Sequence, residues 1–208
     1  MIKTIIFDFG GVVVPISRDK AVKAFEQIGL TDADTRLDKY HQTGIFQDLE
    51  EGRLSADEFR SELSTLCGRP LTYDEVRTAW LGFFTGVDER IIDYIAALRE
   101  RYQVFILSNT NPYVMSWACS PALSTSGRSL RDLAHRLYLS YEIGCTKPAP
   151  EIFEYMLRDS GINPAEALFI DDGAGNTARG AEYGLHTFTP ENGSDWRADL
   201  TTLLQQLA

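Results

Sequence analysis

IIFDFGGVVV, residues 5 to 14, is an apolar run interrupted by one carboxylate and two adjacent glycines. The β-branched residues before Asp8 predict a buried strand over residues 2 to 7. A charge that is buried without a partner is strongly destabilising, so we expect Asp8 to meet a cation, a cluster of donors or a substrate at the end of this strand. The two glycines indicate that the backbone approaches another group closely there.

The composition indicates a globular protein of one or two domains with an excess of acidic residues. The chain has 208 residues, of which 44% are hydrophobic and 24% charged, and its formal net charge is −10. This balance disfavours a general nucleic-acid or anionic-membrane surface. The three cysteines show no CxxC spacing, which favours reduced thiols, and no apolar stretch approaches the ~20 residues of a membrane span. We therefore expect a cytoplasmic monomer or homodimer without nucleic-acid or membrane partners.

Short apolar runs alternate with helical patterns along the second half of the chain. The predicted strands after the first are QVFIL at residues 103 to 107, RLYLS at 136 to 140, ALFI at 167 to 170 and HTFTP at 186 to 190. Strands that alternate with helices favour a parallel sheet with helices on both faces. The predicted fold class is therefore α/β, a Rossmann-like doubly wound parallel sheet.

Residues 18 to 85 show helical patterns and no strand pattern. The segments SADE (55 to 58) and TYDE (72 to 75) are capping boxes that predict helix starts. This block interrupts the alternation directly after the first strand, so we expect an inserted helical domain. The predicted domains are an α/β core over residues 1–15 and 88–208 and a helical domain over residues 16–87.

Two further segments have an ordinary structural interpretation. Trp80, Phe83 and Phe84 recur at helical spacing, which favours a place in the core of the helical domain over a substrate platform. The serine-rich stretch at residues 118 to 129 has no periodicity, which predicts a loop.

Polar side chains follow several of the predicted strands at the point where each strand ends. In an open parallel sheet, ligands bind at the carboxyl ends of the strands. Any one of these residues is unremarkable in a turn or on a surface, but their joint occurrence at strand ends predicts a site. The residues are Asp8, Ser108, Asn109, Lys147, Asp171 and Asp172.

The same segments resemble the signature segments of the haloacid dehalogenase-like hydrolases, over essentially the whole chain. The matching segments are FDFGGVVV around Asp8, FILSNT around Ser108, TKPAPEIF around Lys147 and LFIDDGAGN around Asp171. The helical insert resembles the cap of the branch with a helical cap, and LEEGRLSADEF (49 to 59) is similar to a segment common in such caps. Within the family, the chain is similar to sugar-phosphate phosphatases of the α-glucose-1-phosphate type.

The resemblance implies a phosphatase that acts on a small phosphorylated metabolite, such as a sugar phosphate. Asp8 would attack phosphorus and form an aspartyl-phosphate that water then cleaves. Ser108 would donate its hydroxyl to a phosphoryl oxygen, and Asn109 would offer a second donor. Lys147 would hold Asp8 ionised and neutralise the transferring group.

The resemblance also implies Mg²⁺ as a cofactor, because Mg²⁺ prefers oxygen ligands from few protein groups plus phosphate and water. The Asp8 carboxylate, the Gly10 carbonyl and Asp172 would hold the ion, and Asp171 would act one layer behind them or through water. A metal would also explain how three carboxylates tolerate one another.

One position departs from the family pattern. Many phosphatases of this family have a second aspartate two residues after the nucleophile, which acts as general acid and base, and here that position is Gly10. Loss of such a group lowers rates by typically ~10² to 10⁴. Three explanations compete: a residue of the helical domain such as Asp19 or His41 supplies the proton, the leaving group is acidic enough to depart alone, or the reaction is not phosphoryl transfer.

Two alternative functions follow from that departure. Haloacid dehalogenases of the same family also lack the second aspartate, but they need no Mg²⁺ and usually lack the tandem carboxylates, so Asp171 and Asp172 count against dehalogenation. A non-catalytic binding module with the same fold is the other alternative. The joint retention of Asp8, Ser108 and Lys147 counts against it.

Overall fold

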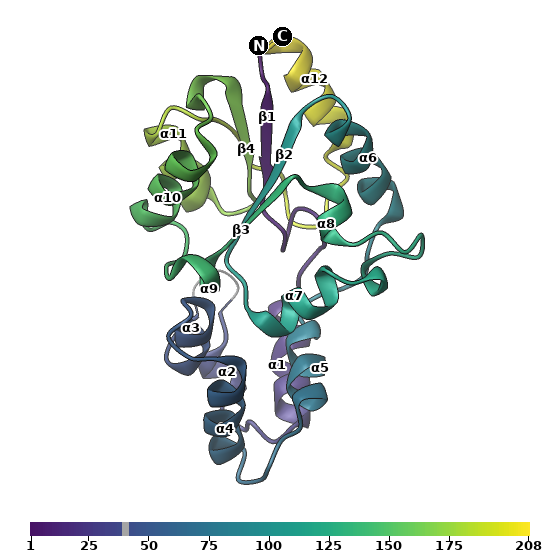
Figure 1. The fold of residues 1–208 in the computed structure, drawn as a ribbon. Helices are drawn as coiled ribbons and strands as arrows, with labels where there is room; N and C mark the ends of the chain where they lie inside the picture. Colours follow the sequence, from purple (N-terminus) through teal and green to yellow (C-terminus); the bar gives the residue numbers. More distant parts are fainter. Residues whose placement is uncertain (39–41) are drawn as a thin grey trace.

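A five-stranded parallel sheet with the strand order β3-β2-β1-β4-β5 forms the centre of the molecule in the computed structural model (Figure 1), which describes residues 1–38 and 42–208. This topology confirms the predicted doubly wound α/β sheet. The strands are β1 (Thr4–Phe7), β2 (Gln103–Ser108), β3 (Arg136–Leu139), β4 (Ala167–Ile170) and β5 (His186–Phe188).

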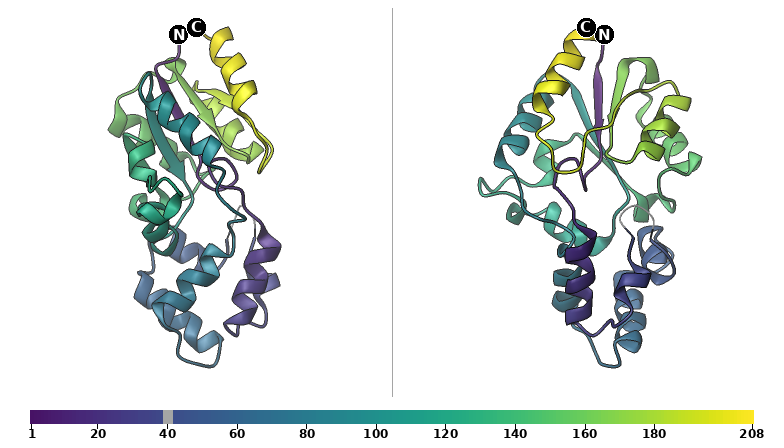
Figure 2. Two further views of the ribbon diagram at one scale, coloured as in Figure 1. Left: turned by 90° about the vertical axis from the view of Figure 1, so that its right-hand side faces the viewer. Right: turned by 180° about the vertical axis from the view of Figure 1, so that it is seen from behind.

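Helices cover both faces of the sheet because successive strand residues point to opposite sides. Ile5 and Phe7 belong to the hydrophobic cluster that includes α6 and α12, whereas Ile6 belongs to the cluster on the side of α10. Figure 2 shows these layers from two further sides. The helices of this part are α6 (Glu89–Arg99), α7 (Pro112–Ala118), α8 (Leu130–Leu133), α9 (Ser140–Ile143), α10 (Pro150–Ser160), α11 (Ala174–Glu182) and α12 (Arg197–Gln206), with short 3₁₀ helices at Pro121–Leu123 and Pro164–Glu166.

The register of the sheet brings the strand ends together at one edge. Phe7, the last residue of β1, lies between Ile106 of β2 and Ile170 of β4. The chain continues the pairing by one residue, since the amide of Asp8 donates to the Ile170 carbonyl at 2.8 Å. Residues that directly follow β1 and β4 are therefore neighbours, as the parallel arrangement predicts.

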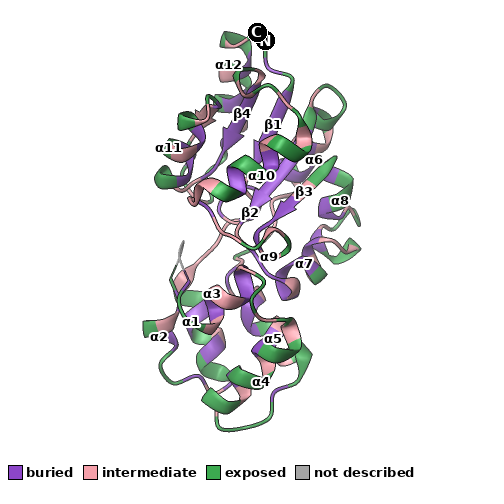
Figure 3. Cartoon of the chain, turned by 60° about the vertical axis from the view of Figure 1, so that its left-hand side comes forward, coloured by how far each residue is buried: buried purple, intermediate pink, exposed green. Residues whose placement is uncertain are grey.

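The first five helices form a separate bundle beyond the carboxyl edge of the sheet (Figures 1 and 3). Its centre is aromatic: Phe46 lies 5.3 Å from Phe25, 5.3 Å from Phe59 and 5.7 Å from Trp80 between ring centroids. Both predicted capping boxes are present, at the starts of α4 and α5. The helices are α1 (Arg18–Gln27), α2 (Ala33–Arg36), α3 (Ile45–Glu50), α4 (Ala56–Leu66) and α5 (Tyr73–Leu81).

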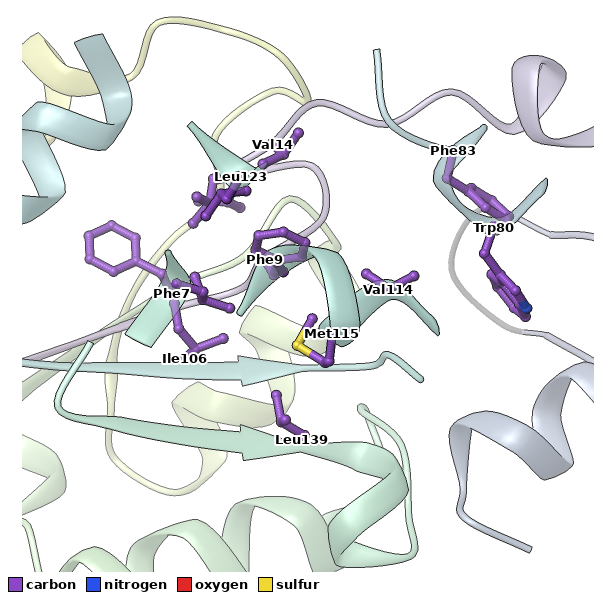
Figure 4. Close-up of a cluster of buried hydrophobic side chains, with 14 of the residues drawn as sticks. Phe7, Phe9, Val14, Trp80, Phe83, Ile106, Val114, Met115, Leu123 and Leu139 are labelled. Carbon is purple, nitrogen blue, oxygen red and sulfur yellow. The ribbon is translucent and has the colours of Figure 1, made fainter. Parts of the chain in front are cut away.

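Two chain segments connect the bundle to the sheet, and they run side by side. The amide of Ser17 donates to the Phe83 carbonyl at 2.7 Å, and the amide of Thr85 donates to the Pro15 carbonyl at 3.0 Å. Buried apolar side chains continue from one part into the other, as Figure 4 shows for Phe9, Val114 and Trp80. The domain boundaries at residues 15/16 and 87/88 stay a prediction.

Several local predictions need correction. Residues 112 to 118 form α7, which the sequence analysis did not predict; Asn111 caps it by accepting from the amides of Tyr113 and Val114, and proline occupies its first turn. The stretch 118 to 129, predicted as a loop, contains a 3₁₀ turn. Strand β1 begins two residues later than predicted, at Thr4.

Within the described residues, no helix is long and apolar enough to cross a bilayer.

Candidate active site

A pocket lies between the carboxyl edge of the sheet and the helical bundle. Most of the predicted site residues line it from the side of the sheet, and residues of the bundle line it from the other side. Asp171 lies beneath its floor, with no solvent exposure. The predicted residues in the lining are Asp8, Gly10, Ser108, Asn109, Lys147 and Asp172.

Lys147 is the electrostatic centre of this floor. Its ammonium lies 2.6 Å from Asp171 Oδ2 and 3.1 Å from Asp8 Oδ1, and its side chain is fully buried. Burial by itself lowers the pKa of Lys147, but the attraction of Asp171 and Asp8 outweighs burial, and the net shift is upward. The ammonium therefore stays charged, with one carboxylate on each side.

Asp171 is held by further donors. Its Oδ1 accepts from the Gly173 amide at 2.8 Å and from Asn176 Nδ2 at 3.0 Å. Asn176 thus fixes the carboxylate that holds Lys147. Asp171 is therefore buried behind the pocket in contact with Lys147, and its expected role behind the metal ligands stays a prediction.

Asn109 holds the backbone that carries Lys147. Its Nδ2 donates to the Lys147 carbonyl at 2.9 Å, and its Oδ1 accepts from the Lys147 amide at 2.7 Å. This reciprocal pair gives Asn109 a positioning role that its sequence context did not reveal. One amide hydrogen remains for a ligand, so the predicted contact of Asn109 with a phosphoryl oxygen stays a prediction.

Ser108 ends β2 and is 1% exposed. Its hydroxyl makes a long contact of 3.3 Å to the Asn109 carbonyl, so the proton is easily redirected to a better acceptor in the pocket. The following turn is braced by Ser140, whose hydroxyl accepts from the Thr110 amide at 2.9 Å. The turn therefore presents Ser108 on a rigid support.

Three carboxylates converge at the edge of the sheet in a way that suits a divalent cation. One oxygen each from Asp8, Asp171 and Asp172 lie within 4.8 Å of one another. Gly11 makes this approach possible: its φ is +87°, and a Cβ there would lie 2.5 Å from the Asp172 carboxylate. Since Lys147 already holds Asp171, the pair Asp8 and Asp172 faces the pocket as the candidate metal ligands.

The carboxylate cluster perturbs Asp8 itself. Burial raises the pKa of Asp8, the Lys147 ammonium opposes the shift, and Asp171 and Asp172 add to it, so that the pKa reaches about 7. The negative charges at the pocket floor thus exceed what one lysine compensates. A bound cation would favour the ionised form of Asp8.

Neither residue that the sequence offered as a replacement proton donor is found in the described pocket lining. Asp19 does not line the pocket, and its side chain is 87% exposed, beside Arg18. His41 lies outside the described residues. The structure instead places Glu50, which the sequence analysis did not single out, in the lining opposite Asp8.

The aromatic residues Trp80 and Phe83 are core residues as predicted, at 2% and 6% exposed, and both also reach the pocket lining together with Phe84. Gln42, from the bundle, and Asn111, from the sheet domain, add amide groups to the lining. The pocket lining therefore combines carboxylates that suit a cation with apolar side chains and amide groups.

Comparisons with known proteins agree with this geometry. A model of the haloacid dehalogenase-like hydrolases matches residues 2–184. D-ribitol-5-phosphate phosphatase of Bacteroides thetaiotaomicron is 64% identical over 204 residues, which cover 98% of this chain and 99% of that protein. A HAD-like family hydrolase from Porphyromonas gingivalis superposes with a TM-score of 0.94 at 44% identity, covering 99% of this chain and 98% of the other. A wild-type HAD family enzyme from Bacteroides thetaiotaomicron, solved with magnesium and inorganic phosphate, superposes with a TM-score of 0.86 at 34% identity over 94% and 98% of the two chains.

Proposed function

The chain belongs to the haloacid dehalogenase-like hydrolase family, and we propose that it is a Mg²⁺-dependent phosphatase of an open-chain sugar-alcohol phosphate, with D-ribitol 5-phosphate as the first candidate substrate. The observation that carries the reaction type is the convergence of Asp8, Lys147 and Asp172 at one pocket. The substrate class rests on the 64% identity, over nearly the whole of both chains, to a D-ribitol-5-phosphate phosphatase.

Asp8 is the proposed nucleophile. Its carboxylate attacks phosphorus, the bond to the sugar-alcohol oxygen breaks, and water then cleaves the aspartyl-phosphate. Lys147 lies 3.1 Å from Asp8 Oδ1, where it favours the ionised nucleophile and offsets charge on the transferring group. Ser108, at the end of β2, donates its hydroxyl to a phosphoryl oxygen.

The residues of the pocket floor fit the implied Mg²⁺. The Asp8 and Asp172 carboxylates and the Gly10 carbonyl would hold it, which matches the preference of this ion for oxygen ligands. When bound, the ion offsets the negative charge of the phosphate and of the carboxylates.

Phosphate ester hydrolysis accounts for the site better than the two alternatives. Dehalogenation needs no cation, whereas three carboxylates within 4.8 Å of one another match a cation site. A binding module without catalysis does not need a nucleophile paired with a buried lysine. The cytoplasmic location and the monomeric or homodimeric state stay predictions.

A substrate screen tests this proposal. The protein is assayed for phosphate release from D-ribitol 5-phosphate, aldose phosphates, nucleotides and p-nitrophenyl phosphate, with Mg²⁺ and with excess chelator. We expect Mg²⁺-dependent release with a preference for the open-chain sugar-alcohol phosphate. Equal rates with aldose phosphates would remove the substrate assignment, and release in chelator would remove the metal dependence. Asp8→Asn must abolish turnover of every substrate.

A further inference from the structure

The proposed reaction needs a proton donor for the leaving group. The phosphate of D-ribitol 5-phosphate is an ester of a primary alcohol, and an alkoxide of that kind departs poorly without a proton. Gly10 has no side chain, and the titratable residues among the described pocket lining are Asp8, Glu50, Lys147 and Asp172. Three of these already have roles as nucleophile, counter-ion and metal ligand, which leaves Glu50.

Glu50 is the last residue of α3, and it enters the pocket from the helical bundle. The residue is 8% exposed and lines the same pocket as Asp8. Within residues 1–38 and 42–208, no donor hydrogen-bonds to its carboxyl or forms an ion pair with it. The little surface that Glu50 exposes belongs to a pocket-lining residue, so a ligand in the pocket is the partner that its carboxyl can serve.

The end of α3 is fixed on the same loop that carries Lys147. Glu51 Oε1 accepts from Thr146 Oγ1 at 3.2 Å and from Gln47 Nε2 at 2.9 Å. Gly52 passes so close to the sheet domain that a Cβ there would lie 2.2 Å from the Tyr141 carbonyl oxygen. These contacts join the end of α3 to the sheet domain. The position of the Glu50 carboxyl in the pocket therefore depends on the sheet domain as well as on the helical bundle.

The surroundings of Glu50 favour its protonated form. Burial raises the pKa of this carboxyl, and the charge of Asp8 raises it further, to about 8. The other charged groups of the described lining are Lys147, which is held by Asp171 and Asp8, and Asp172. Burial is the larger of the two causes and does not depend on a cation, so the pocket favours the form of Glu50 that carries a proton it can donate.

We propose that Glu50 is the general acid and base of this enzyme; the proposal rests on the phosphatase function given above. As the Asp8 oxygen bonds to phosphorus, the bond to the sugar-alcohol oxygen breaks, and that oxygen takes the proton of Glu50. The resulting Glu50 carboxylate then accepts a proton from the water whose oxygen attacks the phosphorus of the aspartyl-phosphate. The bond between phosphorus and Asp8 breaks, inorganic phosphate leaves, and Glu50 is protonated again.

The test compares an alkyl and an aryl substrate with Glu50→Gln, in the presence of Mg²⁺. Nitrophenolate departs without a proton, so the variant should release the first equivalent of nitrophenol from p-nitrophenyl phosphate nearly as fast as the native enzyme. Later turnovers should be slow, because the water step lacks its base. Hydrolysis of D-ribitol 5-phosphate should fall by ~10² to 10⁴ in kcat, since this reaction lacks both the acid and the base. Glu62→Gln on α4, an exposed residue of the same bundle, is the matched control and should behave as the native protein.

Two results would overturn the role of Glu50. One is an equal loss on both substrates without a burst of nitrophenol, which would indicate a structural defect or a role in binding phosphate. The other is unchanged turnover of both. If the native enzyme cleaves p-nitrophenyl phosphate and no sugar-alcohol phosphate, the substrate proposal fails, while the burst followed by slow turnover still tests Glu50. Thermal unfolding in chelator controls for folding: Glu50→Gln should melt no lower than the native protein.

Discussion

Replacing Lys147 by methionine should destabilise the metal-free protein strongly, and Mg²⁺ should recover part of the loss. The substitution keeps an unbranched apolar side chain of the same length as the lysine stem but removes the ammonium that lies 2.6 Å from Asp171 and 3.1 Å from Asp8. Asp171 has no exposed side-chain surface, and Asp8 has 13%, so neither charge can be solvated well by water.

The expected loss follows from the partners that remain. Removing one partner of a buried ion pair typically lowers the free energy of unfolding by about 3 to 5 kcal/mol. Asp171 keeps its hydrogen bonds from Gly173 and Asn176, so we expect the lower end, about 3 kcal/mol. In the variant, burial and the charges of Asp171 and Asp172 act on Asp8 without the opposing ammonium, so the pKa of Asp8 in the folded state lies further above its value in the unfolded chain. The folded state then binds more protons, so the loss should grow as the pH rises from 5 to 8.

Urea unfolding in chelator at pH 5 and pH 8 measures this loss. The matched control is Lys3→Met, which removes an ion pair of similar length, 2.7 Å to Glu166, but with the lysine side chain 63% exposed. Exposed pairs contribute about 0 to 1 kcal/mol. Added Mg²⁺ should stabilise Lys147→Met more than the native protein, because the cation takes over part of the lysine's role. If Lys147→Met and Lys3→Met lost the same free energy of unfolding at both pH values, the conclusion that buried Lys147 stabilises the two carboxylates would be refuted.

Three further outcomes are expected. Asp172→Asn should weaken Mg²⁺ binding in a calorimetric titration and lower activity at limiting metal; full activity of the native enzyme in excess chelator would contradict the metal site. Binding of BeF₃⁻, a phosphate mimic, should change hydrogen exchange at residues 15 to 20 and 84 to 90, because these side-by-side connections are the hinges about which the bundle would close; unchanged exchange with the mimic bound argues against closure. The metal-free protein should lose stability as the pH rises from about 5 to 8, because folded Glu50 keeps its proton up to about 8 while the unfolded chain releases it near 4.5. Glu50→Gln should remove at most ~3 kcal/mol of that loss at pH 7. If the free energy of unfolding depended on pH in the same way in the variant and the native protein, a raised pKa of Glu50 would be contradicted.

The sheet and its polar edge could be predicted because both depend on local patterns and one general rule. Apolar runs that end in Asp8, Ser108 and Asp171 identify strands, and parallel strands bring their carboxyl ends to one edge. The capping boxes of α4 and α5 could likewise be predicted, because each consists of four consecutive residues. Helix α7 was missed because its seven residues carry little periodicity, and its stability comes from the Asn111 cap and the burial of Tyr113.

The roof of the pocket could not be predicted in the same way. The position of Glu50 depends on contacts such as that between Glu51 and Thr146, which are 95 residues apart in the chain. Nothing in the helical region distinguishes Glu50 from Asp19 before α3 is docked on the core. Gly52, two residues after Glu50, has a left-handed backbone and lies against the Tyr141 carbonyl, and this close approach is apparent only in the folded structure. The clamp of Asn109 on Lys147 also depends on the docking of two distant loops.

Chemical trapping of the intermediate tests most directly whether Asp8 is the nucleophile. The enzyme is mixed with Mg²⁺ and substrate, quenched in acid during turnover, and treated with borohydride, which reduces an acyl phosphate to the alcohol. Peptide mass spectrometry then locates the product. We expect homoserine in place of Asp8, dependent on substrate and Mg²⁺, with Asp171 and Asp172 unmodified. A burst of nitrophenol from p-nitrophenyl phosphate in Glu50→Gln, the variant expected to accumulate the intermediate, without any homoserine at position 8 would contradict the account.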